Sequence, residues 1–182
     1  MESITNNEFL NSVLESEAWK EVSSRESFSM EMIEKFADKL DWEEISGNQS
    51  ILWTVDGISK YANKIHWDDF SNSCPDNIIT ETTLNKFSGK WDWKCLSNRD
   101  VFYNNWSLLE KFADKVNWGE IITNWNIEKP VEFFARFQQY IPMSKLQDSS
   151  LWRAMVEARS KKIMQEAIGI NRLFIQIFHT GL

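Results

Sequence analysis

The chain repeats one phrase, Lys35-Phe36-Ala37-Asp38-Lys39-Leu40-Asp41-Trp42-Glu43-Glu44-Ile45-Ser46. A second copy reads Lys111-Phe112-Ala113-Asp114-Lys115-Val116-Asn117-Trp118-Gly119-Glu120-Ile121 and differs at few positions. Two more tryptophans, Trp67 and Trp93, lie between the copies, so successive tryptophans from Trp42 are 25, 26 and 25 residues apart. A fixed period of this length is typical of proteins built from structural repeats.

Each copy also has an aromatic residue six positions before the tryptophan, with apolar residues three before and four after that aromatic. This spacing places three apolar side chains on one face of a helix, which we expect to be about ten residues long. An Asp or Asn precedes most of the tryptophans, and both are preferred N-cap residues. A second, shorter helix is therefore expected to begin at each tryptophan.

The sequence predicts an all-α fold, a short α-solenoid of about five two-helix repeats of about 25 residues with terminal capping helices. Residues 1–28 are a degenerate N-terminal repeat or cap, residues 29–150 the helical repeat stack, and residues 151–182 a basic C-terminal capping helix and tail. The predicted core is the ladder of regularly spaced aromatics: Trp19, Phe36, Trp42, Tyr61, Trp67, Phe87, Trp93, Phe112, Trp118 and Phe137.

The pattern changes from Ser150 onward, where basic residues outnumber acidic ones by three. One helical stripe there contains Leu151, Met155 and Ala158, and a more apolar stripe contains Trp152, Val156, Ile163 and Ala167. The simplest interpretation is a longer helix that caps the last repeat. The apolar segment after Gly169 has three open arrangements: packing back on the stack, joining a partner chain, or staying partly exposed.

Composition excludes several classes of protein. The 182 residues carry a net charge of -7 and 42% hydrophobic residues, with no uncharged apolar run long enough to span a membrane. The start lacks the layout of a signal peptide, and two cysteines cannot form a disulfide framework, so we expect a cytoplasmic protein. The acidic balance argues against nucleic acid as a partner.

Ten tryptophans would suit a protein that stacks on sugars or bases, but the regular ones are better explained as core. Aromatic residues that do not follow the 25-residue period are the better candidates for binding, because large exposed aromatic side chains mark contact surfaces. We expect these to emerge on one face of the stack: Trp53, Tyr103, Trp106 and Trp125.

Lysines form a second candidate surface, because pairs four residues apart recur in four repeats and would build two basic rows. These rows contain Lys35, Lys39, Lys60, Lys64, Lys86, Lys90, Lys111 and Lys115. One hypothesis is a docking ridge for an anionic partner. The other, which we favour, is local pairing with acidic residues of the same and neighbouring repeats, with the lysine stems covering apolar side chains.

No residue set suggests chemistry. His66 occupies the cap position that Asp or Asn takes in other repeats, and Cys74 and Cys95 have no histidine at metal-ligand spacing. The sequence contains no phosphate-binding glycine loop or nucleophile elbow. We therefore expect no catalytic residues, no metal and no cofactor.

Residues 35–46 and 111–121 resemble the phenylalanine-lysine-aspartate-tryptophan repeats of uncharacterised proteins from large DNA viruses, some bacteria and their phages. The likeness spans about residues 29–146, and it implies a helical scaffold without implying catalytic residues. The third copy departs from the pattern at Gly89 and Trp91, and the fifth lacks both the tryptophan and the cap.

The sequence thus predicts a non-enzymatic repeat scaffold that binds another macromolecule, most simply a protein. Self-association through the C-terminal segment is one open form of this binding. Two alternatives are an acidic phage or mobile-element inhibitor that mimics a polyanion, and an enzyme with a groove lined by carboxylates of several repeats.

Overall fold

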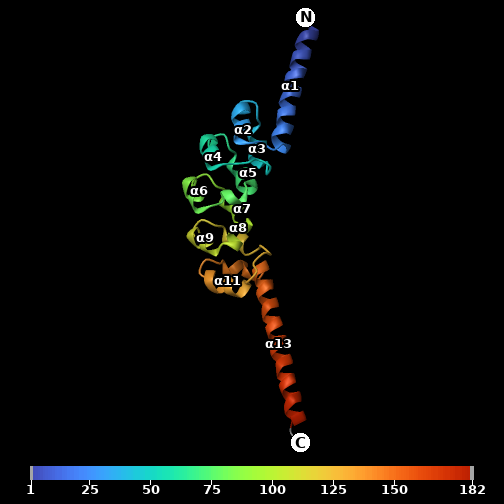
Figure 1. Ribbon diagram of the computed structural model, residues 1–182, viewed down its shortest axis with the longest axis vertical. Coiled ribbons are helices and arrows are strands. Elements are labelled where there is room, and N and C mark those ends of the chain that lie inside the picture. The colour runs from blue at the N-terminus through green and yellow to red at the C-terminus, as the bar shows by residue number, and fades with distance from the viewer. Residues whose placement is uncertain (1, 181–182) are drawn as a thin grey trace. The chain divides into compact units, whose positions relative to one another are not determined.

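The protein is all-helical in its computed structural model, which describes the backbone of residues 2–180 and the side chains of residues 7–169 (Figure 1). No strand occurs within residues 2–180, and none of the helices there is long and apolar enough to cross a membrane. The helices are α1 (Glu2–Arg25), α2 (Met30–Phe36), α3 (Trp42–Gly47), α4 (Val55–Tyr61), α5 (Trp67–Ser73), the 3-10 helix η1 (Asp76–Ile78), α6 (Glu81–Lys86), α7 (Trp93–Leu96), α8 (Asp100–Asn104), α9 (Trp106–Lys111), α10 (Trp118–Ile121), α11 (Pro130–Phe137), α12 (Met143–Leu146) and α13 (Ser150–Thr180).

The chain divides into two compact units, residues 1–111 and residues 112–182. In the first unit, α2, α4, α6 and α9 follow one another along one side, and α3, α5 and α7 lie next to them (Figure 1). The second unit contains α10 to α13, with α11 packed against α13.

The second helix of each repeat begins at the expected residue: α3, α5, α7 and α10 start at a tryptophan, and α12 starts at Met143. The cap residues explain these starts. Asp41 accepts hydrogen bonds from the backbone N–H groups of the two residues after Trp42, and Asp92 and Asn117 do the same in their repeats. His66 makes no such bond, although α5 begins at the next residue.

The first helices have six to eight residues and are shorter than the expected ten. Competing hydrogen bonds explain the early end of α2. In a longer helix the N–H of Asp41 would bond to the carbonyl of Ala37, four residues back. Instead it donates to the hydroxyl of Ser23 at 3.0 Å, and the Ala37 carbonyl accepts from the indole N–H of Trp42 at 2.9 Å.

A row of buried serines repeats this contact. Four serines that each follow a repeat tryptophan by four residues are fully buried: Ser23, Ser46, Ser71 and Ser97. The hydroxyls of the first three accept the N–H of the residue that precedes the next tryptophan. Ser46 accepts from His66 at 2.9 Å, and Ser71 accepts from Asp92 at 3.0 Å. These serines therefore join one repeat to the next.

Two apolar positions form the centre of each repeat. The residue three before the aromatic and the residue three after the tryptophan are fully buried in every copy from the first to the fourth. These residues are Ile33, Ile45, Ile58, Phe70, Leu84, Leu96, Leu109 and Ile121.

The predicted aromatic ladder is core only in part, because Tyr61, Phe87, Phe112 and Phe137 are buried, whereas Phe36 and most of the tryptophans are half-buried. Repeat tryptophans pack against the aromatic residue of the next copy, with ring centroids 5.4 Å apart for Trp19–Phe36 and 4.9 Å for Trp42–Tyr61. Two further pairs are Trp67–Phe87 at 5.2 Å and Trp118–Phe137 at 5.4 Å. Trp118 is buried, while Trp19, Trp42, Trp67 and Trp93 are half-buried, so one side of these rings meets solvent or a lysine.

The degenerate N-terminal copy is one continuous helix, α1, in place of two short ones. Trp19 and Ser23 keep the repeat contacts, but Leu10 and Val13 are 54% and 40% exposed. The C-terminal segment is also one helix, α13, whose backbone continues through Gly169 to Thr180. The three arrangements left open for the side chains after Gly169 lie outside the described residues.

Candidate protein-binding surface

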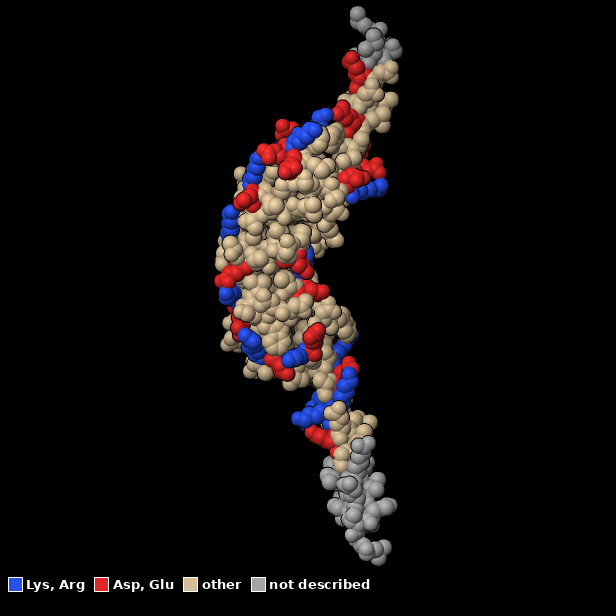
Figure 2. All heavy atoms as spheres, viewed as in Figure 1, with Lys and Arg blue, Asp and Glu red and all other residues tan. Residues whose placement is uncertain are grey.

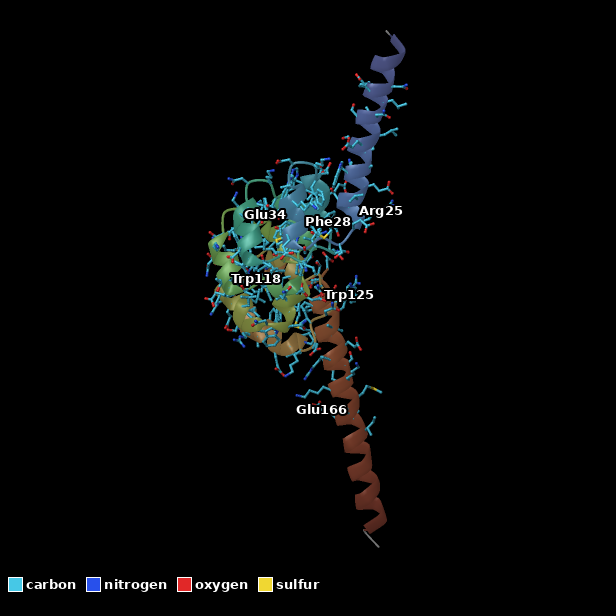
Figure 3. The ribbon with its side chains drawn as sticks, turned by 45° about the horizontal axis from the view of Figure 1, so that its top comes forward. Arg25, Phe28, Glu34, Trp118, Trp125 and Glu166 are labelled. Atoms are coloured by element: carbon cyan, nitrogen blue, oxygen red, sulfur yellow. The ribbon has the colours of Figure 1, made fainter. Side chains whose placement is uncertain are left out.

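The most exposed tryptophan among the described residues is Trp125, whose side chain is 71% accessible to solvent. It lies in the loop between α10 and α11, beside the first turns of α13 (Figure 3). The guanidinium of Arg153 on α13 lies over the indole, 5.5 Å from the ring centroid. A cation at that distance orients the ring, since it is attracted to the π face.

Buried contacts on both sides hold this loop in place. Ile122 is fully buried and Ile127 nearly so, on either side of the exposed tryptophan. The N–H of Leu151 donates to the Ile122 carbonyl at 3.0 Å, and the Ser150 hydroxyl donates to the Thr123 carbonyl at 2.6 Å. The loop is therefore tied to the start of α13, and Trp125 projects from an ordered base.

The exposed surface continues along α13. This helix packs through Leu151, which is fully buried, and through the half-buried side chains of Ala154, Met155 and Ala158. The more apolar stripe faces away, and Trp152, Val156 and Ile163 are 38%, 48% and 51% exposed. We call Trp125, Trp152, Val156 and Ile163 the Trp125 surface.

Sequence reasoning named Trp125 but missed the α13 part of this surface. The stripe of Trp152, Val156 and Ile163 was recognised, yet it was expected to help cap the last repeat. The available signal was the second stripe, because a helix that already packs through Leu151 and Met155 leaves the other stripe free.

The expectation that the other off-rhythm aromatics emerge at the surface is wrong for Trp53 and Tyr103, which are only 5% exposed. Trp53 meets Phe70 edge-on with ring centroids 5.1 Å apart, and its indole N–H has no hydrogen-bond acceptor among the described residues. The Tyr103 hydroxyl donates to the Ser97 carbonyl at 2.7 Å, which satisfies its polar end inside the core. Trp106 is half-buried and donates to the Tyr103 carbonyl at 3.0 Å.

These residues fill space between repeats. A 25-residue repeat with two short helices leaves a long connection, and apolar residues in that connection have to pack under the neighbouring copy. The offset of these aromatic residues from the 25-residue period indicated a different position within the repeat, and it did not indicate exposure to solvent.

The lysines after the aromatics reach back to the preceding repeat. The ammonium groups of Lys39 and Lys64 lie 5.4 Å from the ring centroids of Trp19 and Trp42, and that of Lys90 lies 5.9 Å from Trp67. Lys64 also donates to the Ala37 carbonyl at 3.2 Å, as Lys90 does to that of Ala62. Ion pairs with acidic residues of the preceding segment add to this, Lys39 with Glu15 and Lys64 with Asp38, both at 3.3 Å.

The lysines before the aromatics behave similarly. Lys60 pairs with Glu34 at 2.5 Å, Lys86 donates to the Ser59 hydroxyl at 2.6 Å, and Lys111 pairs with Glu81. The hydrogen bond to Glu34 is the main cause of a raised pKa for Lys60. Lys35 lies 5.3 Å from the Phe36 ring centroid, and Lys115 is exposed. Basic and acidic side chains alternate along the side of the first unit that α2, α4, α6 and α9 form (Figure 2), which agrees with local pairing.

The thiols have raised pKa values. Burial is the main cause of a pKa of about 11 for Cys74, which the nearby Arg99 guanidinium counteracts. Burial also raises the pKa of Cys95 to about 11, and the hydrogen bond to the Asp92 carboxylate and its charge add to the effect. Both thiols are therefore protonated near neutral pH, whereas a nucleophilic or metal-binding cysteine is a thiolate.

Carboxylates show no acid–base pair with opposite shifts among the described residues. Burial alone would raise the pKa of Asp92, but hydrogen bonds from the Cys95 thiol and from the backbone N–H groups of Cys95 and Lys94 outweigh it and lower the pKa. The pKa of Glu157 is lowered by its hydrogen bond with Lys161. Within the described residues, no three His, Cys, Asp or Glu side chains are close enough to hold a metal ion.

Comparison of the chain with models of protein families, with curated proteins and with solved structures finds no match.

Proposed function

We propose that this protein is a non-enzymatic helical-repeat scaffold that binds another protein through the Trp125 surface. In this proposal the repeats form a short α-solenoid of about five two-helix units with terminal capping helices, and the protein works in the cytoplasm. The observation that carries the proposal is the 71% exposure of Trp125 on a loop whose neighbours Ile122 and Ile127 are buried.

An exposed tryptophan is costly in water and valuable in an interface. Covering Trp125 would remove on the order of 150 Å² of ring surface from water, which corresponds to roughly 3–4 kcal/mol. Interfaces draw much of their energy from a few buried tryptophans, tyrosines and arginines surrounded by apolar contacts. Trp125 with Arg153 and the neighbouring Trp152 and Val156 has this composition.

Pre-organisation supports the same proposal. The loop is bonded to α13 through Leu151 and Ser150, so a partner would not have to pay for ordering it. The lysine rows are a weaker choice, because most of their ammonium groups already contact rings, carbonyls or carboxylates of the preceding repeat.

Polyanion mimicry is disfavoured for a similar reason. Acidic side chains along the first helices, such as Glu34, Asp38 and Glu81, are paired with lysines of later segments. A mimic of a nucleic-acid backbone needs a continuous run of negative charge, and here the charges alternate.

Affinity capture from the cell that produces the protein tests the proposal. The baits are the wild-type chain, Trp125→Ala, and Met143→Ala as a matched change at an exposed apolar side chain on α12. We expect mass spectrometry to identify a protein that is retained by wild type and Met143→Ala and lost with Trp125→Ala. Retention at about 0.5 M salt would support an apolar contact, since charge-based contacts are largely screened there.

Equal capture by all three baits would contradict the Trp125 surface. Binding that survives Trp125→Ala but disappears in high salt would instead favour an electrostatic partner.

A further inference from the structure

The first described helix carries an apolar face that nothing in its own unit covers. Phe9, Leu10, Val13 and Leu14 on α1 are 71%, 54%, 40% and 57% exposed. At 100° per residue Leu10 and Leu14 lie on the side of α1 opposite to Trp19 and Ser23, while Val13 and Phe9 lie on the flank between the two sides. Because Trp19 and Ser23 pack against α2 and the turn after it, the side of α1 that carries Leu10 and Leu14 is directed away from the repeats.

The last described helix has a matching stripe. Trp152, Val156, Ile163 and the exposed Ala167 follow one another at spacings of four, seven and four along α13. Every side chain described after Ala158 is exposed, so Ile163 and Ala167 lie beyond the packed part of α13, while Trp152 and Val156 lie on its outer side.

The two helices carry opposite charge. By sequence, residues 2–25 contain five acidic and two basic side chains, a net charge of -3. Residues 150–180 contain five basic and two acidic side chains, a net charge of +3.

The charges also lie on the apolar stripes themselves. Glu17 and Glu21 continue the line of Leu10 and Leu14 at spacings of three and four, and Arg159 lies between Val156 and Ile163 on α13. Glu17 and Arg159 are exposed, and neither forms an ion pair with another described residue.

We propose that the apolar stripe of α13 is covered by the apolar face of α1 from a second copy of this chain. The proposal rests on the proposed function, because it names a partner for the α13 part of the Trp125 surface. Pairing α13 with α13 would bring together two helices that each have a net charge of +3, and pairing α1 with α1 would bring together two helices that each have a net charge of -3. Both pairings are electrostatically unfavourable. The mixed pair brings apolar surfaces together with complementary charge, which places Glu17 and Arg159 on facing stripes.

This contact is heterologous, since the two surfaces that meet are different. Each chain in a pair therefore keeps one free α1 and one free α13, and association continues head to tail into open assemblies or a closed ring. The assembly is expected to weaken with salt, because part of the attraction is between exposed charges.

Two single substitutions on the full-length chain test the proposal, and both add a glutamate. Leu14→Glu alters the α1 face and Ile163→Glu alters the α13 stripe, and each affects a side chain that is more than half exposed. Asn11→Glu and Gln165→Glu are matched controls, because they add the same charge at exposed positions on other faces of the same helices. Circular dichroism melts check that all four variants fold as wild type does.

Sedimentation velocity over a range of concentrations gives the readout. Wild type and both controls are expected to grow beyond a dimer as concentration rises. Each of the two test variants is expected to associate at least about tenfold more weakly, since an apolar contact is replaced by a charge. Mixed in equal amounts, the variants are expected to form one heterodimer and nothing larger, because each retains one intact surface.

Each of the following outcomes would overturn the proposal. If the wild-type chain stays monomeric at all concentrations, the partner of α13 is not a second copy. Pairing of α1 with α13 within one chain would also give this result. Leu14→Glu that still assembles while Ile163→Glu does not indicates α13–α13 pairing, and the reverse result indicates α1–α1 pairing. A monomeric wild type together with a cellular protein lost from the Trp125→Ala bait would refute this proposal and leave the proposed function standing.

Discussion

Removing the hydroxyl of Ser46 tests the contact that joins one repeat to the next. Ser46 is fully buried, donates to the Trp42 carbonyl at 2.6 Å and accepts from the backbone N–H of His66 at 2.9 Å. In Ser46→Ala the His66 N–H loses its acceptor at a partly buried site. Leaving such a donor unpaired costs about 1–3 kcal/mol of unfolding free energy.

Urea titration and thermal unfolding followed by circular dichroism measure this loss. For a chain of this size the expected cost corresponds to a fall in Tm of roughly 2–10 °C. Ser71→Ala should behave alike, because Ser71 is also fully buried and accepts from Asp92 at 3.0 Å. Ser88→Ala is the matched control, since that side chain is exposed, and surface changes of this kind stay within about 0.5 kcal/mol.

Unfolding of Ser46→Ala and Ser71→Ala at the same temperature and urea concentration as Ser88→Ala would contradict a stabilising role for the two hydroxyls. That result would mean that water or a small shift replaces the serine hydroxyl at no cost.

Three further predictions follow from the same geometry. Lys64→Met keeps the aliphatic stem over Trp42 but removes the charge, so the unfolding free energy should fall by at most about 1 kcal/mol. Capture of a protein partner should not change. Loss of the partner in a folded Lys64→Met variant would instead support the hypothesis that the lysine rows are a docking surface. The pKa of Asp92 is lower in the folded chain than its ordinary value, so its stabilising effect is present above about pH 4 and is lost as pH falls through the folded pKa. The stability difference between wild type and Asp92→Asn should therefore shrink between pH 7 and pH 3 in urea titrations, and a difference that grows would contradict this sign. Cys74 is buried with a pKa of about 11, so a thiol reagent at pH 8 should modify it only as the chain unfolds, whereas modification at the rate of a free cysteine would show that the site opens.

The sequence predicted the helical class and the start of the second helix in each repeat, because a tryptophan after an Asp or Asn cap combines two local signals. The length of the first helix was overestimated, since its end at Phe36 depends on Ser23, which lies in the preceding copy. Local spacing contains no information about that contact. The solenoid of five two-helix repeats stays a prediction.

The candidate site was predicted in part. Trp125 was named from its position outside the rhythm, but Trp53 and Tyr103 were named by the same rule and are buried. What separates them is whether the neighbouring copy covers the connection, which is a tertiary property. On α13 one of the two apolar stripes is packed and the other is exposed, and periodicity within one helix does not encode which of them the rest of the unit covers.

Site-specific photo-crosslinking in the producing cell tests the central claim most directly, which is that a protein partner meets the chain at Trp125. A benzophenone amino acid replaces Trp125 in one variant and Ser88, an exposed residue beside Lys86 and Lys90, in another. The account predicts that irradiation links a protein to position 125, either another chain or a second copy, and links none to position 88. Adducts at position 88 alone, or equal adducts at both positions, would contradict it.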